Sequence, residues 1–523
     1  MSAEIRRALA GDPGAAGDWR RIAFARFAAD PAAAALFFAR AIFSEAPSPA
    51  RPAAAAADWN NLAEARRAAA APRAVPAARR ALALAPDLPE AHNTWGNLLL
   101  QAHVDARMPD TAPAAAPAAA QAAAQAATAF ARALALRPGF SRAAYNLAAA
   151  AAENGETGRA IDLYRALLAR QPDFLEARWN LALALLAAGR WREGWQAHES
   201  RRADPRLAPR VFAAAGGGAI PTWDGSAPAG RRILLASEQG FGDTIQFLRY
   251  VPQVIALGAR VTLDVPAPLR ALAAAIPGLD RLIVTGEAVP EVDFEAPLMS
   301  LPLLLGPEHP PPPPPYLAAD PARRAAWRQA LGQTGGQTGG QAQGDSAGPS
   351  VPRLPLIGIA WAGNPEQPND RRRSIAEADL APLAALGRVR FVSLQKGRTL
   401  PPACRAAGWH DAGPDLADFA ETAALIAELD LVIAVDTAVA HLAGALGKPL
   451  WVLLSTAADW RWPRGRRRTP WYPGARQVWR RPAEPWRETL ARLAGHLAAI
   501  PFDPAGDPAG DPDGGNSDGV GPA

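Results

Sequence analysis

Three polar residues in the stretch AVDTAVAHLAGALGKP (434–449) lie where an apolar, strand-like run passes into a helix-like one. Asp436 ends the first run, Thr437 falls in the first turn of the expected helix, and His441 follows one turn later. The first N–H groups of a helix have no partner inside it and carry the positive end of its dipole, so a pyrophosphate could bind there. Asp436 could accept from a ribose hydroxyl and His441 could donate to a phosphate. The alternative is that Asp436 caps the helix and His441 is a packing residue.

A second candidate site is Gly240-Phe241-Gly242-Asp243, which also lies between an expected strand and an expected helix. Gly240 and Gly242 would let the backbone approach a ligand closely, since glycine has no side chain. Asp243 would face the cleft in which a ligand binds, and its carboxylate could act as a general base toward a hydroxyl group of that ligand. The alternative is that Asp243 is only the N-cap of the helix, a role that aspartate fills well.

Both candidate sites belong to a region in which strand-like and helix-like segments alternate. Strands are expected at 231–237, 259–265, 279–284, 354–361, 389–395, 429–436 and 449–454. Such alternation predicts parallel sheets of the Rossmann type, in two halves. Ligands of these sheets bind beyond the carboxyl ends of the strands, so we expect the site in the cleft between the halves.

The first 200 residues are helical in composition and contain a repeat. Pro172 follows Pro138 by 34 residues, and Asn180 follows Asn146 by the same interval. A period of 34 with proline opening each unit is typical of tetratricopeptide repeats. A third copy starts at Pro86, and we attribute its extra length to the run PDTAPAAAPAAAQAAAQ, as a loop or a helix extension.

Composition limits the classes of function. The chain has 523 residues, enough for two or three domains, and 55 basic against 50 acidic residues, an excess too small to indicate nucleic-acid binding. One cysteine, Cys404, excludes an internal disulfide framework and a cysteine zinc cluster. The start of the sequence has no apolar signal segment, and no run reaches the ~20 apolar residues of a membrane span. We therefore expect a cytoplasmic protein without a metal, a cofactor or a membrane span.

Several motifs together resemble a known family. VDTAVAHLAGALGKP and GFGD resemble motifs of the heptosyltransferase-type enzymes, glycosyltransferase family 9. More closely, EQGFGDTIQFLRY, WAGNPEQPNDRRRSI, FVSLQKG and DWRW with PWYP look like bacterial proteins that fuse tetratricopeptide repeats to such a module. The resemblance runs from about 80 to 500. It implies a GT-B-type fold, a nucleotide-sugar donor, inversion at the anomeric carbon and no metal.

The resemblance also implies roles for single residues. The catalytic Asp of the family falls on Asp243, and its nucleotide-binding Asp-Thr pair and His fall on Asp436, Thr437 and His441. The heptosyltransferases usually carry glycine where this chain has Ala438. That difference could alter how the backbone approaches a phosphate.

The cation that would neutralise the leaving phosphates is less well defined. The phosphate-binding lysine of the family maps near Arg373 in NDRRRSI, and Lys396 is a second candidate. Gln395, at the end of an expected strand, could bind the base or ribose. The alternative for Arg373 and Lys396 is that both are ordinary solvated charges.

The segment 451–486 holds six tryptophans, whose rings could stack on the apolar face of a sugar. We expect Trp460 to face the cleft and assign the others to core packing. The basic run RWPRGRRR (461–468) could meet an anionic acceptor, but a solvated loop is the alternative.

The expected fold is an α plus α/β multidomain chain: a tetratricopeptide helical solenoid followed by a GT-B-type pair of Rossmann-like domains. The expected ranges are a solenoid over 1–205, degenerate at 1–75 and with an insert near 105–125; an acceptor-side Rossmann-like half over 225–310; a Pro/Gly/Gln-rich linker over 311–352; a nucleotide-sugar-side half over 353–500; and a disordered tail over 501–523.

The expected function is an inverting, metal-independent glycosyltransferase, hexosyl- or heptosyltransferase-like. It would transfer a sugar from a nucleotide-sugar donor to a protein or glycan acceptor that the repeats recruit. Asn146 and Asn180 would bond a peptide in the groove of the repeats, or serve interhelical packing instead. The alternative function is a non-catalytic adaptor with a decayed glycosyltransferase fold.

Overall fold

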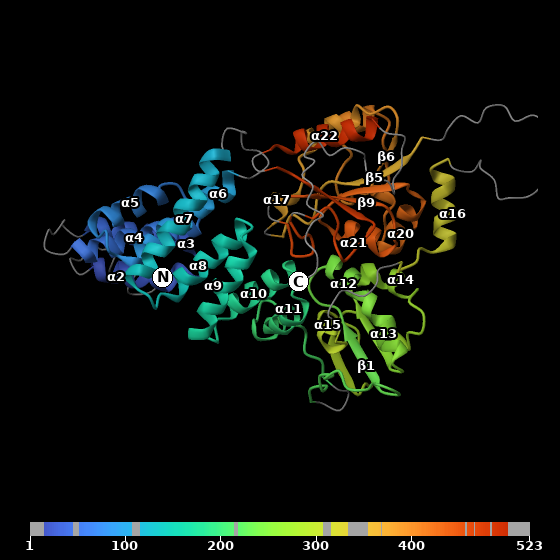
Figure 1. The fold of residues 1–523 in the computed structure, drawn as a ribbon, viewed down its shortest axis with the longest axis horizontal. Helices are drawn as coiled ribbons and strands as arrows, with labels where there is room; N and C mark the ends of the chain where they lie inside the picture. The colour runs from blue at the N-terminus through green and yellow to red at the C-terminus, as the bar shows by residue number, and fades with distance from the viewer. Residues whose placement is uncertain are drawn as a thin grey trace, which may run out of the picture. The chain divides into compact units, whose positions relative to one another are not determined.

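The computed structural model in Figure 1 describes residues 15–44, 52–106, 116–213, 218–306, 315–332, 354–367, 369–455, 458–464, 466–481 and 484–499. The chain forms two compact units, which we call unit 1 (Met1–Ala184) and unit 2 (Leu185–Ala523). Among the described residues, no helix combines the length and the apolar character needed to cross a membrane.

Unit 1 consists of helices that pack on their neighbours in sequence. They are α2 (Ala15–Phe27), α3 (Pro31–Ser44), α4 (Pro52–Ala68), α5 (Ala74–Leu84), α6 (Pro89–Ala106), α7 (Ala116–Leu136), α8 (Ser141–Glu153), α9 (Thr157–Arg170) and α10 (Leu175–Ala187), which crosses the unit boundary. Close packing depends on small residues: a side chain at Gly96 would lie 2.5 Å from the ring of Phe130. The helices α8 and α10 begin 34 residues apart, as the repeat predicts. The expected helical-repeat region is confirmed.

Two details of the repeat region add to the expectation. Helical pairs α2–α3 and α4–α5 pack together within 15–84, a range that includes the stretch where the repeat is degenerate in sequence. From Ala116 the alanine-rich run belongs to helix α7, so the helix alternative holds for that part of the run, because alanine has the highest helix propensity. The segment 107–115 before it lies outside the described residues.

Unit 2 begins with helix α11 (Trp191–His198) and a short 3-10 helix, η2 (Glu199–Ala203). The predicted solenoid end at 205 therefore needs correction, because this segment belongs to unit 2.

The first lobe of unit 2 is a parallel sheet of four strands in the order β3-β2-β1-β4. Its elements are β1 (Arg232–Ala236), α12 (Phe241–Phe247), η3 (Leu248–Tyr250), α13 (Val251–Ala256), β2 (Arg260–Val265), η4 (Ala267–Leu269), α14 (Arg270–Ala273), β3 (Arg281–Val284), β4 (Phe294–Pro297), η5 (Leu298–Ser300) and α15 (Leu301–Leu304). The three expected strands are confirmed. The helix expected after β1 is split into three pieces around Pro252, which cannot donate a helical hydrogen bond.

The second lobe is a parallel sheet of six strands in the order β10-β9-β8-β5-β6-β7. Its elements are β5 (Leu356–Ala360), α17 (Asp370–Arg373), η6 (Glu377–Leu380), α18 (Ala381–Ala384), β6 (Arg390–Ser393), α19 (Pro402–Ala406), β7 (His410–Asp411), η7 (Gly413–Asp415), α20 (Phe419–Glu428), β8 (Leu431–Val435), α21 (Ala438–Ala445), β9 (Leu450–Leu454), β10 (Ala475–Trp479) and α22 (Trp486–Ala499). The four expected strands are β5, β6, β8 and β9. Their runs are apolar because helices cover both faces of the sheet.

The linker expected at 311–352 is wrong over 315–332. Helix α16 (Pro321–Ala330) forms there, with the Asp320 side chain accepting from the backbone of its first turn and proline at its first position. It packs on α20, where the Trp327 indole donates to Glu421 at 2.7 Å. Residues 333–352 and the tail 501–523 lie outside the described residues.

Candidate functional site

Asp243 is a partly buried carboxylate in the first turn of α12 that faces the second lobe. The N-cap is Gly240 and not Asp243, so the alternative needs correction: Asp243 Oδ2 accepts from the Gly240 N–H at 3.0 Å and so supports the helix start from its third residue. Its Oδ1 accepts from Nη2 of Arg461 at 2.5 Å. Burial raises the pKa of Asp243, and the charge of Arg461 opposes that rise. A carboxylate with raised proton affinity suits a general base.

The two motifs meet where helices α12 and α21 cross (Figure 1). A side chain at Gly242 would lie 2.8 Å from Cδ2 of His441 and 3.6 Å from Cα of Ala438. A side chain at Gly240 would meet Oδ2 of Asp243 at 3.2 Å. The expectation that these glycines admit a ligand to the backbone therefore needs correction, since Gly242 allows the helices to touch and Gly240 lies against the cap.

Replacing Gly242 by alanine should weaken unit 2 by about 1–3 kcal/mol, the usual cost of overpacking a filled contact. The new methyl group would push against the His441 ring, which is buried and cannot rotate away freely. Urea unfolding measures the change. Gly474→Ala is the matched control, because a side chain there has nothing within 4 Å. Equal stability of the two variants would contradict the close crossing.

Thr437 precedes helix α21 and has an unsatisfied hydroxyl. It is the N-cap residue, but its side chain makes no capping hydrogen bond. Its Oγ1 is buried and has no hydrogen-bond partner among the residues that the structure describes. A buried hydroxyl without a partner is costly, so its position at a helix start is consistent with a ligand oxygen as partner.

Arg373 lies beside this helix start. Its Nη1 donates to the main-chain oxygen of Asp436 at 2.7 Å, and its Nε donates to Asp370 Oδ1 at 3.2 Å. Its side chain is 23% exposed. The structure thus brings Arg373 next to the Asp436–Thr437 pair, as expected of a phosphate-binding cation.

His441 is buried between aromatic rings and is neutral at neutral pH. Its Nδ1 lies 2.9 Å from the Tyr472 hydroxyl, and its ring stacks 5.8 Å from that of Trp462. Burial lowers the pKa of His441 well below its usual value, and the charges of Arg461, Arg249 and Arg373 add to this. These contacts support the packing alternative. The Nε2 atom nevertheless lies 3.8 Å from Oδ1 of Asp436, at the edge of the site.

Asp436 gives the site a measurable pH signature. Burial, and after it the nearby Asp459, raise the pKa of Asp436 to about 6, although Trp462, Arg373 and Arg461 act to lower it. A folded-state pKa above the usual 3.8 means that the native chain binds the proton more tightly than the unfolded chain. The contribution of Asp436 to stability is therefore complete below about pH 4 and is lost as the pH rises through about 6.

Asp436→Asn should consequently be more stable than the native chain at about pH 8, and this advantage should disappear near pH 4. The physical reason is that the amide carries no charge to desolvate. Calorimetric Tm values across this pH range measure the difference. A difference in Tm that does not depend on pH would contradict the raised pKa.

Arg461 is the main site residue that the sequence analysis missed. Its side chain is 6% exposed, and it bonds Asp243, Asp459 at 2.8 Å and the side-chain oxygen of Gln246. Exposed arginines follow Arg461 in the run RWPRGRRR (461–468). The sequence of this run predicts a solvated or acceptor-binding loop and does not single out Arg461. Its place between two tryptophans in DWRW was the available signal.

Trp460 does not offer the exposed face that was expected of it. The residue is 7% exposed and packs edge-on against Trp195 at 5.5 Å and Trp471 at 5.2 Å. The guanidinium of Arg461 lies 4.3 Å from the centre of its ring. The prediction of a sugar-stacking platform is wrong because aromatic neighbours and Arg461 occupy the ring.

Gln395 and Lys396 already have protein partners. The Gln395 side chain accepts from the N–H groups of Trp361 and Ala362 and donates to the Ala362 carbonyl, so it orders the loop after β5. Lys396 is exposed and donates to the Ala417 carbonyl at 2.8 Å. To contact a nucleotide, either side chain would have to replace its present protein hydrogen bonds by bonds to the ligand.

The two repeat asparagines also bond within unit 1. Nδ2 of Asn146 donates to the side chains of Asn93 and Asn97 at 2.9 and 3.0 Å. Nδ2 of Asn180 donates to the Tyr145 hydroxyl at 2.9 Å and lies 3.3 Å from the Tyr164 hydroxyl. These bonds support the interhelical alternative.

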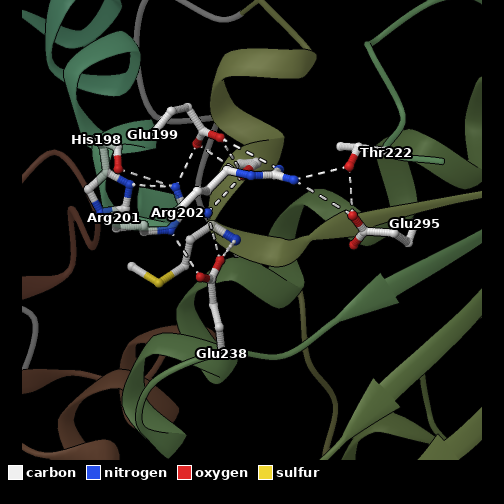
Figure 2. A network of polar contacts seen from close by, with 9 residues as sticks. His198, Glu199, Arg201, Arg202, Thr222, Glu238 and Glu295 are labelled. Carbon is white, nitrogen blue, oxygen red and sulfur yellow. Dashed lines mark hydrogen bonds and ion pairs between the residues drawn. The ribbon is translucent and has the colours of Figure 1, made fainter. Parts of the chain in front are cut away.

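A buried ion-pair network, shown in Figure 2, includes Glu238 in the turn between β1 and α12. The fully buried Arg201, on η2, donates to both carboxylate oxygens of Glu238 at 2.9 and 2.8 Å, and also bonds Glu199 and Ser300. Glu238 precedes Gln239, whose φ of 58° is unusual for a residue other than glycine. The network thus fixes the chain where it turns from β1 into α12.

Part of the second lobe matches a known protein family. Residues 416–493 match the sequence model described as Glycosyltransferase family 9 (heptosyltransferase). That segment holds Asp436, Thr437, His441 and Arg461, whereas Asp243 lies outside it.

The chain is 30% identical over 400 residues to Protein FlbA of Caulobacter vibrioides, covering 70% of this chain and 62% of that protein. It therefore spans less than two thirds of that relative.

Two solved structures overlap with different parts of the chain. TTC0263, a thermophilic TPR protein in Thermus thermophilus, is 16% identical and covers 36% of this chain and 92% of that one, with a TM-score of 0.31. The glycosyl transferase family 9 from Veillonella parvula DSM 2008 is 11% identical and covers 54% and 93%, with a TM-score of 0.37. TM-scores this low carry no argument about function.

The fold and the matched segment together confirm the architecture expected from the motifs. The chain joins a tetratricopeptide-like helical region to a GT-B-type pair of Rossmann-like lobes, and residues 416–493 of the second lobe match the model described as Glycosyltransferase family 9 (heptosyltransferase).

Proposed function

We propose that unit 2 is an inverting glycosyltransferase that uses a nucleotide-sugar donor without a metal ion. The observation that carries the proposal is the crossing of α12 and α21, where Gly242 lies against His441. Gly242 also approaches Ala438, so the crossing brings together the chain positions next to Asp243 and next to Thr437, whose hydroxyl has no partner among the described residues. One lobe thus supplies a base, and the other supplies a helix start suited to a diphosphate.

The proposed reaction is a single displacement. The oxygen of an acceptor hydroxyl attacks the anomeric carbon, and its proton passes to Asp243. The bond between that carbon and the phosphate oxygen breaks, and its electron pair stays on the departing nucleoside diphosphate. Attack from the side opposite the leaving group inverts the anomeric configuration. The backbone N–H groups at the start of α21 and the side chain of Arg373 stabilise the departing charge.

The acceptor is proposed to be a protein or glycan that the helical repeats of unit 1 recruit. Stacked helical repeats form extended concave surfaces that suit such partners. The donor sugar belongs to the hexose or heptose class, by analogy with the family that residues 416–493 match. The proposed enzyme would act in the cytoplasm.

A thermal-shift screen of UDP-, ADP-, GDP- and dTDP-sugars tests the proposal. At a free concentration of 100 Kd, a donor that binds only the native state should stabilise it by about 2.7 kcal/mol. The matching nucleosides, which lack phosphates, are the control and should shift Tm much less. If no nucleotide sugar stabilises the protein, the enzymatic proposal fails and the non-catalytic adaptor becomes the better account.

A further inference from the structure

Arg461 is a buried cation that contacts both the proposed base and the acidic side of the proposed donor site. Its Nη2 donates to Asp243 on α12, and its Nη1 donates to Asp459 at 2.8 Å on its own loop. The charge of Asp436 also acts on Arg461. A single guanidinium therefore balances carboxylates that come from both lobes.

The charges around the site call for a second cation when a diphosphate binds. Asp243, Asp436 and Asp459, with Asp370 beside Arg373, supply four carboxylates, against the two guanidinium groups of Arg461 and Arg373. Arg373 already donates two hydrogen bonds to other groups. A diphosphate would add negative charge beside these carboxylates, and its oxygens can accept two parallel hydrogen bonds from an arginine, as a carboxylate can.

The same contact limits Asp243 as a base. One carboxylate oxygen accepts from the Gly240 N–H and the other from Arg461. An acceptor hydroxyl must donate to one of these oxygens before its proton can transfer. The ion pair with Arg461 stabilises the charged carboxylate and so weakens it as a proton acceptor.

We propose that Arg461 binds the donor diphosphate at the phosphate next to the sugar, and that this binding moves its Nη2 hydrogen bond from Asp243 to a phosphate oxygen. The inference rests on the proposed function. The phosphate is the sugar-linked one because Arg461 lies against the base, which must stand near the anomeric carbon. Donor binding then frees Asp243 to accept the proton of the acceptor hydroxyl, so the base becomes active only with the donor in place.

Isothermal titration of Arg461→Gln tests the first half of the proposal. The probes are UDP, ADP, GDP and dTDP with their monophosphates, starting from whichever diphosphate binds the native chain. Loss of the guanidinium should weaken the diphosphate about tenfold or more and the monophosphate much less. Arg461→Lys, which keeps the charge and loses the fork, should fall between. The control is Arg487→Gln, an exposed arginine on α22, which should match the native chain.

A double-variant cycle tests the second half. Because Asp243 competes with the phosphate for Arg461, Asp243→Asn should tighten diphosphate binding several-fold in the native background. The same substitution should have no such effect beside Arg461→Gln. A merely structural arginine would weaken diphosphate and monophosphate equally, and Asp243→Asn would not tighten binding, which would overturn the inference.

The two proposals fail in different ways. If the native chain binds none of the diphosphates, the proposed function fails and this inference fails with it. The native chain and Arg461→Gln could instead show the same ratio of diphosphate to monophosphate affinity. In that case only the role of Arg461 is overturned.

Discussion

Asp243→Asn should abolish sugar transfer while keeping the fold and without weakening diphosphate binding, which it should tighten. The expected loss in kcat is about 10²–10⁴-fold, the usual contribution of a positioned general base. The amide oxygen of asparagine can still accept from the Gly240 N–H, so the cap of α12 survives. The amide cannot take the acceptor proton at neutral pH. Steady-state transfer assays with the donor found in the screen, beside titration of the diphosphate, separate the two effects.

Asp320→Asn is the matched control for this substitution. Asp320 caps α16 through the same kind of bond, with its carboxylate accepting from the backbone N–H of Arg323 at 2.8 Å. It should change neither transfer nor nucleotide binding. If Asp243→Asn kept transfer within about tenfold of the native rate, the base would have to be another group.

The fold was predictable because its strands are buried on both faces. The runs LPLIGIAW and LDLVIAVD read as continuous apolar segments, and they form β5 and β8 in the middle of the six-stranded sheet. The strands that escaped prediction, β4, β7 and β10, have no such continuous apolar run. ARQVW, which forms β10, lies at an edge and alternates with polar residues, and FEAP, which forms β4, is short and contains proline.

The candidate site was predictable only in part. The motif residues Asp243 and Thr437 each follow a strand, and the carboxyl ends of parallel strands mark where ligands bind. Arg461 was missed because its burial depends on Asp243, 218 residues away in the sequence. Nothing local in RWPRGRRR distinguishes it from its exposed neighbours. Trp460 was misjudged for the same reason, since its partner Trp195 comes from a distant helix.

Arg201→Met should destabilise unit 2 by about 3–5 kcal/mol, the usual cost of removing one partner of a buried ion pair. Arg201 is fully buried and the side chain of Glu238 is 3% exposed, so the substitution leaves a buried carboxylate without its cation (Figure 2). Urea unfolding measures the loss. Glu291→Gln is the control: the Glu291 side chain, which pairs with Arg232, is 79% exposed, and its loss should leave the stability nearly unchanged.

Adding Glu238→Leu to Arg201→Met should recover most of the lost stability, because the double variant has no uncompensated buried charge at this pair. The sugar-transfer activity of this double variant shows whether the Arg201–Glu238 pair only stabilises unit 2 or also positions the proposed base, Asp243. Glu238 also accepts from the Met299 N–H at 3.1 Å and precedes the unusual turn at Gln239, so its loss releases the loop before Asp243. We therefore expect stability to return while kcat stays low and the KM for the donor stays near native. If both stability and kcat returned, the network would only hold unit 2 together, and the position of Asp243 would depend on its crossing with α21 alone.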